Sequence, residues 1–296
     1  MNLRELGEER LLRRLLPRLP RNSAVLAGAG DDCAVVRFAG ADKLLLLKTD
    51  CVVEGIHFAR DTPAKAVGWK AMARPLSDFA AMGGLPQFAL ITLMAPSATT
   101  AFWTTELYRG LEKAARAFKV AIVGGETSRS PGLLAISISV TGAVEKDRWI
   151  SRSGGKAGDD LFVTGRLGGS LRGKHLRFTP RIAEARWLSG HFRIHAMMDL
   201  SDGLGADLPR LASASKVSFE LEEGVLPRTR GCSSQEAITD GEDYELLFAL
   251  AASDRIALER AWKKKFAKLP LTRIGRFIPR SAARPPKLPR GYDHFQ

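Results

Sequence analysis

The stretch MDLSDGLGADL, residues 198–208, places three carboxylates among apolar residues and two glycines. Asp199 and Asp202 flank Ser201, and Asp207 follows in the same stretch. One interpretation is structural: Ser201 caps a helix whose first turn holds Asp202, where the helix dipole favours negative charge. The alternative is a metal site, because carboxylates on one short turn can share a hard cation. Taken by itself, the stretch favours the structural interpretation.

On both sides of this stretch, segments with helix and strand patterns follow one another. Helices are predicted at 3–16, at 64–82 with a break near Pro75, at 100–118, at 181–189, after the turn at 199–203, and at 253–267. Strands are predicted after the turn at 28–33, from residue 43 into a loop that carries Asp50 and His57, and at 87–94, 120–126, 133–144, 161–165, 217–222, 244–250 and 271–277. Residues 279–290 are predicted to form a loop. The mixture favours an α+β or α/β protein in two domains, divided at the turn-rich segment 151–160.

The composition is that of an ordinary globular protein. The chain has 296 residues, of which 45% are hydrophobic and 26% charged. It has no apolar run long enough to cross a bilayer, and its N-terminus lacks the apolar core of a secretory signal. We therefore expect a cytoplasmic protein without a membrane partner.

The cysteines and the net charge argue against two other classes. Cys33, Cys51 and Cys232 are odd in number and form no CxxC pair, so a disulfide framework or a structural zinc site is not expected. The net charge of +13 raises the question of nucleic-acid binding. The basic residues at 172–186 and 273–290 lack the accompanying aromatic strand or helix-turn-helix pattern. We favour a solvated basic surface and keep attraction of phosphorylated small molecules as the alternative.

Two glycine-rich stretches fit phosphate-binding loops only in part. GGSLRGKH (168–175) follows a predicted strand, but His175 stands where a P-loop needs Ser or Thr. GAGDDC (28–33) is half of a dinucleotide fingerprint and precedes a strand instead of following one. We therefore interpret 168–175 as a glycine-rich connection and 28–33 as a turn, and neither as a phosphate-binding loop.

Single acidic residues recur at turn-like or strand-end positions, mostly beside small or apolar residues. Carboxylates that converge on one site repel one another unless cations lie among them, and Mg²⁺ prefers oxygen ligands. Their spacing does not establish that they converge, and each taken singly is better explained as a cap or turn residue. The set comprises Asp31, Asp32, Asp50, Asp78, Glu126, Asp199 and Asp202.

Eight motifs occur in the order seen in thiamine-monophosphate kinases: GAGDDCAVV, KTDCVVEGIHF, PLSDFAAMGG, VGGETSR, SRSGGKAGDDLFVTG, MDLSDGL, GEDYELLF and GYDHF. GDDCA and LSDGL are shared across the wider superfamily that includes aminoimidazole ribonucleotide synthetase and selenophosphate synthetase. EGIHF, GEDYEL and GYDHF point more narrowly to the thiamine-phosphate enzyme. The chain therefore resembles this kinase family over nearly its whole length.

The resemblance implies an α+β, aminoimidazole ribonucleotide synthetase-like fold with domains at 1–148 and 149–296. The sheet of the first domain would pair across a homodimer, and nucleotide would lie between the domains. The implied reaction is direct, ATP-dependent phosphorylation of thiamine monophosphate to thiamine diphosphate, with several Mg²⁺ ions and no phosphoenzyme. Such transfer depends mainly on positioning and charge neutralisation, which suits carboxylates and metal ions.

The resemblance also assigns site residues. It implies metal ligands at Asp31, Thr49, Asp50, Asp78, Glu126, Asp199 and Asp202. It implies ATP contacts from Tyr108, Gly125, Arg152 and Ser201, and contacts to the thiamine phosphate from His57, Glu242 and Tyr292. Glu242 would balance the thiazolium cation and Tyr292 would stack on a ring. For Tyr108 and His57, packing is nearly as good an explanation.

Four departures from the family pattern bear on activity. Glu126 replaces an aspartate, and Lys48 stands where a small polar residue is usual, so that it can either contact phosphate or displace a metal ion. The segment 166–180 is short, and Thr239 and Asp240 occupy positions where small residues are common. Two alternatives therefore stay open: an ATP-using relative with a different acceptor, and a catalytically impaired nucleotide-binding homologue.

Overall fold

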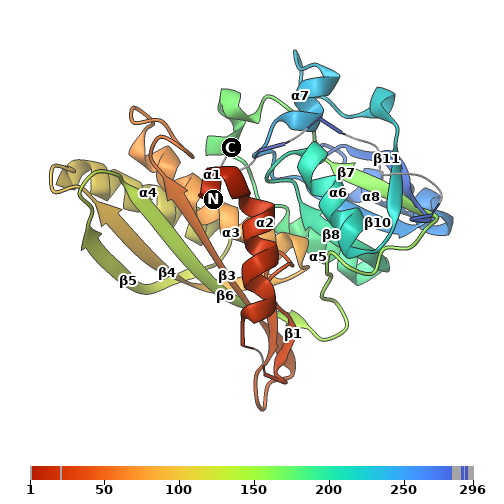
Figure 1. Cartoon of the computed structure of the whole chain (residues 1–296), viewed down its shortest axis with the longest axis horizontal. Coiled ribbons are helices and arrows are strands. Elements are labelled where there is room, and N and C mark those ends of the chain that lie inside the picture. Colours follow the sequence, from red (N-terminus) through yellow and green to blue (C-terminus); the bar gives the residue numbers. More distant parts are fainter. Residues whose placement is uncertain (1, 21, 282–287, 290, 293–296) are drawn as a thin grey trace.

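The computed structural model describes residues 2–20, 22–281, 288–289 and 291–292. In these residues, two β-sheets with their helices form the two halves of the molecule (Figure 1). The α+β class predicted from the sequence is confirmed. The predicted loop at 279–290 falls largely outside the described residues.

The first half is built on a six-stranded sheet with the order β1-β2-β3-β6-β4-β5. Only β4 and β5 pair in parallel among its neighbouring strands, and α4 (Ala101–Ala117) makes the crossover that a parallel pair requires. Asp50 lies inside β3, because this strand extends into the predicted loop as far as Val53, whereas His57 lies beyond the strand. The strands are β1 (Val25–Ala27), β2 (Ala34–Arg37), β3 (Lys43–Val53), β4 (Leu85–Ala95), β5 (Ala121–Arg129) and β6 (Ala135–Glu145).

Helix α3 (Ala64–Ala81) covers the inner face of this sheet and packs along α4. The predicted break at Pro75 is wrong, since the helix continues through the proline. Proline removes one helical hydrogen bond, but all of α3 from Ala71 to its end is buried except Arg74, and this packing holds the helix together. Close approach to α4 depends on Gly68, where a Cβ would lie 2.0 Å from the Leu107 carbonyl oxygen.

The N-terminal helix predicted at 3–16 is divided in two. Gly7, with φ of 72°, ends α1 (Leu3–Leu6) and precedes α2 (Glu8–Leu15). Left-handed backbone of this kind favours glycine, so the break is encoded locally.

The second half is built on a five-stranded antiparallel sheet with the order β8-β10-β7-β11-β9. Strand β7 is buried along its whole length, which explains its continuous apolar pattern. The strands are β7 (Asp159–Thr164), β8 (Ile194–Asp199), β9 (Ser218–Leu221), β10 (Leu246–Ala251) and β11 (Leu271–Ile278). The helices are α5 (Ile182–His191), α6 (Leu204–Ala214), α7 (Ser234–Thr239) and α8 (Arg255–Lys265).

One hydrophobic core continues across both halves, because α3 contacts β3 of the first sheet and β8 of the second. Leu46 and Phe79 belong to the same buried cluster as Phe162 and Phe248. Residues at the junction of the halves are therefore held in fixed relative positions.

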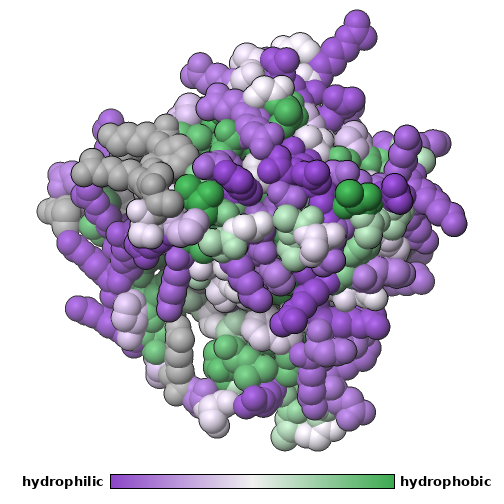
Figure 2. Space-filling model, turned by 90° about the vertical axis from the view of Figure 1, so that its right-hand side faces the viewer, coloured by the Kyte–Doolittle hydropathy of each residue, from purple (hydrophilic) through white to green (hydrophobic). Residues whose placement is uncertain are grey.

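The described residues contain no helix that is both long and apolar enough to span a membrane. The face formed by the second half is mostly hydrophilic, with small and separate apolar patches (Figure 2).

Candidate active site

Three buried carboxylates meet at the junction of the two halves. One oxygen each from Asp32, Asp78 and Asp199 lies within 4.8 Å of the other two. Asp32 precedes β2, Asp78 belongs to α3, and Asp199 ends β8, so each comes from a different element. The Ser77 hydroxyl donates a hydrogen bond of 2.6 Å to Asp199 Oδ2 and ties α3 to the second half. We call these three residues the acidic cluster.

Burial makes negative charge costly in the acidic cluster. Burial and the charge of Asp32 raise the pKa of Asp199 to about 7, against the hydrogen bond from Ser77. Burial also raises the pKa of Asp78 well above its usual range, although the charge of Lys48 opposes this. Carboxylates in such a setting bind protons or cations. Their oxygens are the donor type that Mg²⁺ prefers, so the residues present fit this ion.

Three basic side chains lie against the acidic cluster or the nearby Asp50. Lys48 Nζ is 2.8 Å from Asp78 Oδ1. The Arg152 guanidinium binds Asp32 through two hydrogen bonds of 2.6 and 3.2 Å. Arg74 Nη2 lies 4.0 Å from Asp50 Oδ1 on the inner face of β3. The site therefore contains its own positive charges before any ligand binds.

Asp32, and not Asp31, belongs to the acidic cluster. Asp31 accepts a 2.7 Å hydrogen bond from the backbone N–H of Arg152 and so fixes the loop that follows the first sheet. The two aspartates are neighbours in GDDC, and the sequence offers no local signal that tells which side chain turns inward. Asp32 is thus a site residue that the residue assignments missed.

Thr49 and Glu126 lie on the outer face of the first sheet. Strand register places Thr49 beside Ser139, and it aligns Glu126 with Thr92 and Ser137 of the neighbouring strands. Residues paired in this way share a face, whereas Lys48 and Asp50 alternate to the inner face. The Thr49 hydroxyl accepts a 3.2 Å hydrogen bond from Ser139. The structure of one chain therefore does not bring these two predicted ligands to the acidic cluster.

The 198–208 stretch combines a turn and one cluster residue. Helix α6 begins at Leu204 after Gly203, so the expectation that Ser201 caps it is wrong. Instead, Asp207 accepts hydrogen bonds of 3.1 and 3.0 Å from the backbone N–H groups of Ser201 and Asp202. The residue that accepts these hydrogen bonds, Asp207, lies inside α6, and the N–H groups that it binds belong to the turn before the helix.

Within the same stretch, Asp202 is not part of the acidic cluster. Its carboxylate forms an ion pair with Arg210, which also binds Asp207 at 2.9 Å. Of the predicted ligands in this stretch, Asp199 is the one that joins the cluster.

Two of the residues assigned to the thiamine phosphate meet at Lys70. This lysine is fully buried, and its Nζ lies 2.7 Å from Glu242 Oε1 and donates to the His57 carbonyl. His175 lies 3.0 Å from the same carboxylate. Burial raises the pKa of Glu242, but the bond to His175 and the charge of Lys70 outweigh it and lower the pKa to about 2.

The sequence assignments missed Lys70 and His175. A lysine inside the apolar run VGWKAMA is the signal that marks Lys70, because lysine is almost never fully buried without a partner. His175 had no comparable signal. Tyr292, the third residue assigned to this substrate, donates its backbone N–H to the Asp202 carbonyl at 3.0 Å.

The remaining ATP-assigned residues have structural roles as well. Tyr108 packs against the core from α4 and lines a shallow pocket beside Thr104 and Thr105. Gly125 lies in β5, where a Cβ would be 1.8 Å from the Ile91 carbonyl oxygen, so strand packing alone requires glycine. Neither residue is part of the acidic cluster.

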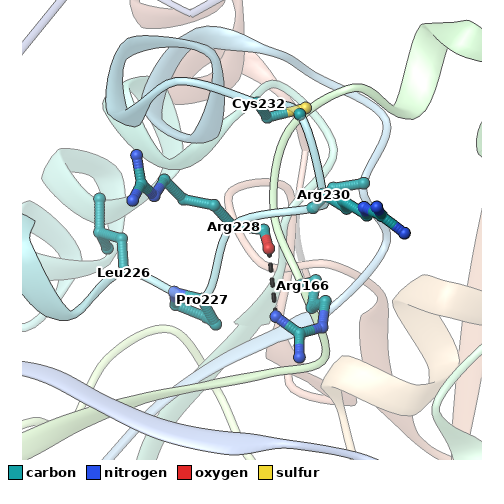
Figure 3. A pocket seen from close by; sticks show the side chains of 8 residues that line it. Arg166, Leu226, Pro227, Arg228, Arg230 and Cys232 are labelled. Carbon is teal, nitrogen blue, oxygen red and sulfur yellow. Dashed lines mark hydrogen bonds between the residues drawn. The ribbon is translucent and has the colours of Figure 1, made fainter.

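The P-loop-like segment 168–175 forms two 3-10 turns instead of a phosphate loop. Its Lys174 Nζ lies 3.2 Å from Glu245 Oε1, so the ammonium group already has a carboxylate partner within the protein. A neighbouring cavity of about 380 Å³ is lined by Arg166, Arg228 and Arg230. Their guanidinium groups point away from one another (Figure 3), so the cavity gathers no convergent anion site.

Comparison with known proteins identifies the two halves. Residues 30–144 match the family described as AIR synthase related protein, N-terminal domain. Residues 135–284 match AIR synthase related protein, C-terminal domain. These matches confirm the expected two-domain, aminoimidazole ribonucleotide synthetase-like fold.

Similarity to individual proteins is closer still. The chain is 37% identical to the thiamine-monophosphate kinase of Rhodopirellula baltica, over 93% of this chain and 90% of that protein. It is 36% identical to the thiamine-monophosphate kinase of Aquifex aeolicus, over 84% of this chain and 87% of that protein. The solved structure described as AaThiL complexed with AMPPCP and TMP superposes with a TM-score of 0.84 and 32% identity, and the match covers 99% of both chains. This chain belongs to the thiamine-monophosphate kinase family of AIR synthase related proteins.

Proposed function

We propose that this protein is a phosphotransferase that converts thiamine monophosphate and ATP into thiamine diphosphate and ADP. The observation that carries the proposal is the acidic cluster of Asp32, Asp78 and Asp199, buried at the junction of the halves. Phosphoryl transfer requires positioned substrates and neutralised charge, and it needs no protein nucleophile. The relative crystallised with AMPPCP and TMP supports the choice of both substrates.

Magnesium is part of this proposal. Asp32, Asp78 and Asp199 are the residues that would hold it, while Asp31, Asp50 and Asp202 stay predicted ligands. When bound, Mg²⁺ supplies charge neutralisation for the phosphate oxygens. The chain itself positions the ligands rigidly, because α3, β8 and the loop before β2 belong to one packed core or border it.

Arg152 is the proposed anchor for the ATP phosphates. Its planar guanidinium binds Asp32 through Nε and Nη2, and its remaining N–H groups can donate to phosphate oxygens. Ser201 lies in the turn that follows β8, next to the acidic cluster in sequence. Tyr108 and Gly125 stay predicted nucleotide contacts.

Glu242 is the proposed partner of the thiazolium cation. Its pKa of about 2 keeps it ionised at neutral pH, so it can balance a permanent positive charge. His57 contributes its carbonyl to the same Lys70 ammonium. Tyr292 is 45% exposed, and its predicted role is to stack on a ring of the substrate.

A homodimer that uses the outer face of the first sheet is also proposed. Leu47, Phe88 and Leu90 lie on this face in adjacent rows and are 38%, 49% and 49% exposed. A second copy would bury these apolar side chains, which is favourable. Thr49 and Glu126 lie on the same face. If they bind metal as predicted, they do so at this interface, in a site to which the second copy contributes.

The division of the chain at 148/149 is a further proposal. It is supported by the end of the first sheet at Glu145 and the start of the second at Asp159. The cytoplasmic location stays a prediction from the sequence.

The direct test incubates the purified chain with ATP, MgCl₂ and thiamine monophosphate and separates the products by chromatography. We expect thiamine diphosphate only when all three components are present. The matched comparison is Asp199→Asn, which should form product far more slowly at the same protein concentration. ATP binding without product would overturn the assignment and favour a different acceptor or an impaired homologue.

A further inference from the structure

Lys48 brings a fixed positive charge to the acidic cluster. Its Nζ donates a 2.8 Å hydrogen bond to Asp78 Oδ1, and the lysine and aspartate side chains are only 22% and 10% exposed. The contact joins β3 to α3, two elements that are packed directly on each other.

The backbone determines the direction of the Lys48 side chain. Strand β3 pairs with β6 in unbroken register, with Lys48 opposite Val140 and Asp50 opposite Ile138. Alternation along the strand then places Lys48 and Asp50 on the inner face, with the buried Leu46 and Val52. The lysine side chain cannot leave this face without breaking the register of the sheet.

The charges at the junction nearly cancel. When all four are ionised, Asp32, Asp50, Asp78 and Asp199 supply four negative charges, and Lys48, Arg74 and Arg152 supply three positive charges in direct or near contact with them. One negative charge remains, which leaves less demand for divalent cations than four carboxylates alone would create.

The two oxygens of Asp78 allow it to serve two cations. Lys48 occupies Oδ1, on the side of the carboxylate toward β3. Among the described residues, the contact of Lys48 is made to Oδ1, so Oδ2 can take part in binding a cation together with Asp32 and Asp199. A short side chain at position 48 would free Oδ1, and Asp50 would then face Asp78 without an ammonium group nearby.

We infer that the Lys48 ammonium takes the place of one divalent cation between Asp50 and Asp78, so that this chain binds one metal ion fewer than the same carboxylates would hold beside a small residue. The inference rests on the proposed function only in assuming that the acidic cluster binds divalent cations. Lys48 is then a positioning residue for Asp78 and sets the metal stoichiometry of the site.

Counting bound Mn²⁺ tests this directly. Free Mn²⁺ is measured by electron paramagnetic resonance in titrations of the wild type, Lys48→Ser and the control Lys43→Ser, without nucleotide or substrate. Lys43 lies on the same strand, is exposed and pairs with Glu145 instead of the cluster. We expect Lys48→Ser to bind one more ion per chain than the wild type, and Lys43→Ser to equal the wild type. An equal count in Lys48→Ser would overturn the inference.

A second variant covers the case in which Lys48→Ser does not fold. Lys48→Ala also removes the ammonium group from Asp78 Oδ1 and introduces no new polar atom. It should bind one more Mn²⁺ ion per chain than the wild type, and a count equal to the wild type would overturn the inference. Because neither count uses ATP or thiamine monophosphate, an inactive enzyme would contradict the proposed kinase while leaving the metal count to decide this point.

Discussion

Lys70 Nζ lies 2.7 Å from Glu242 Oε1, and this ion pair of a buried lysine with a partly buried glutamate connects α3 of the first half to the loop before β10 of the second. Glu242 adopts a φ of 64°, which is unusual for a residue with a side chain. The backbone N–H of Glu242 donates to the Ser201 carbonyl at 2.7 Å, so the loop is also tied to the turn after β8. The ion pair therefore positions the Glu242 carboxylate, the proposed contact to the substrate, and also connects the two halves.

Removing the lysine should destabilise the protein strongly. Lys70→Met leaves the partly buried Glu242 charge beside His175 and Tyr244 without its ammonium partner. Breaking a buried pair in this way costs about 3–5 kcal/mol of unfolding free energy. Urea unfolding followed by circular dichroism measures the loss. The control is Lys65→Met, an exposed position on the same helix. Equal midpoints for the two variants would contradict a structural role for the pair.

Asp199→Asn should separate activity from stability. The substitution removes a charge from the acidic cluster and should lower kcat by about 100-fold, the scale seen when one electrostatic group is removed from an active site. Stability should not fall, because burial already raises the pKa of Asp199 to about 7 and makes its ionised form costly. Steady-state kinetics and urea unfolding measure the two effects, with the exposed Asp147→Asn as control. Retained activity in Asp199→Asn would exclude this carboxylate from the reaction.

The ion pair between Glu145 and Arg186 predicts a pH dependence of stability. Arg186 donates hydrogen bonds of 2.6 and 3.1 Å to the two Glu145 oxygens and lowers the carboxyl pKa from 4.5 to about 2. A folded-state pKa below the unfolded value stabilises the protein fully above pH 4.5, and the contribution is lost as the pH falls toward 2.

The expected size is about 1 kcal/mol, since the Glu145 side chain is partly exposed and water screens the pair. Unfolding free energies of the wild type and Glu145→Gln are compared between pH 6 and pH 2.5, with Glu112→Gln as an exposed control. The difference between wild type and Glu145→Gln should shrink over this interval. A difference that is constant with pH would show that the pair does not stabilise the fold.

Local patterns predicted most of the elements, and particular residues show where they failed. The apolar run that opens LLLLKTDCVV predicts strand β3, but it cannot say which face is turned toward α3. That choice depends on the pairing with β6, which lies about ninety residues further along the chain. The faces of Lys48, Thr49 and Asp50 therefore required the structure.

The errors at Pro75 and at Asp31 have a similar origin. Propensity predicts a break at a helical proline, but burial of nearly every side chain around Pro75 outweighs the lost hydrogen bond. For Asp31 and Asp32, the choice depends on Arg152, which binds the first through its backbone and the second through its side chain. Contacts between residues more than a hundred positions apart cannot be predicted from a short motif.

The exposed apolar residues on the outer face of the first sheet predict that the protein is a dimer and that a charge on this face prevents dimerisation. Leu90 is 49% exposed on this face, and Phe88 beside it has the same exposure, so a dimer would bury both. Leu90→Asp would place a charge in that interface, which opposes association far more than it affects the fold of one chain. Light scattering after size exclusion should give twice the 32.3 kDa chain mass for the wild type and the single chain mass for Leu90→Asp. The control is Leu171→Asp, which is 62% exposed in the second half and should remain dimeric. A wild type of single mass, or a Leu90→Asp variant that still dimerises, would remove this face as the interface.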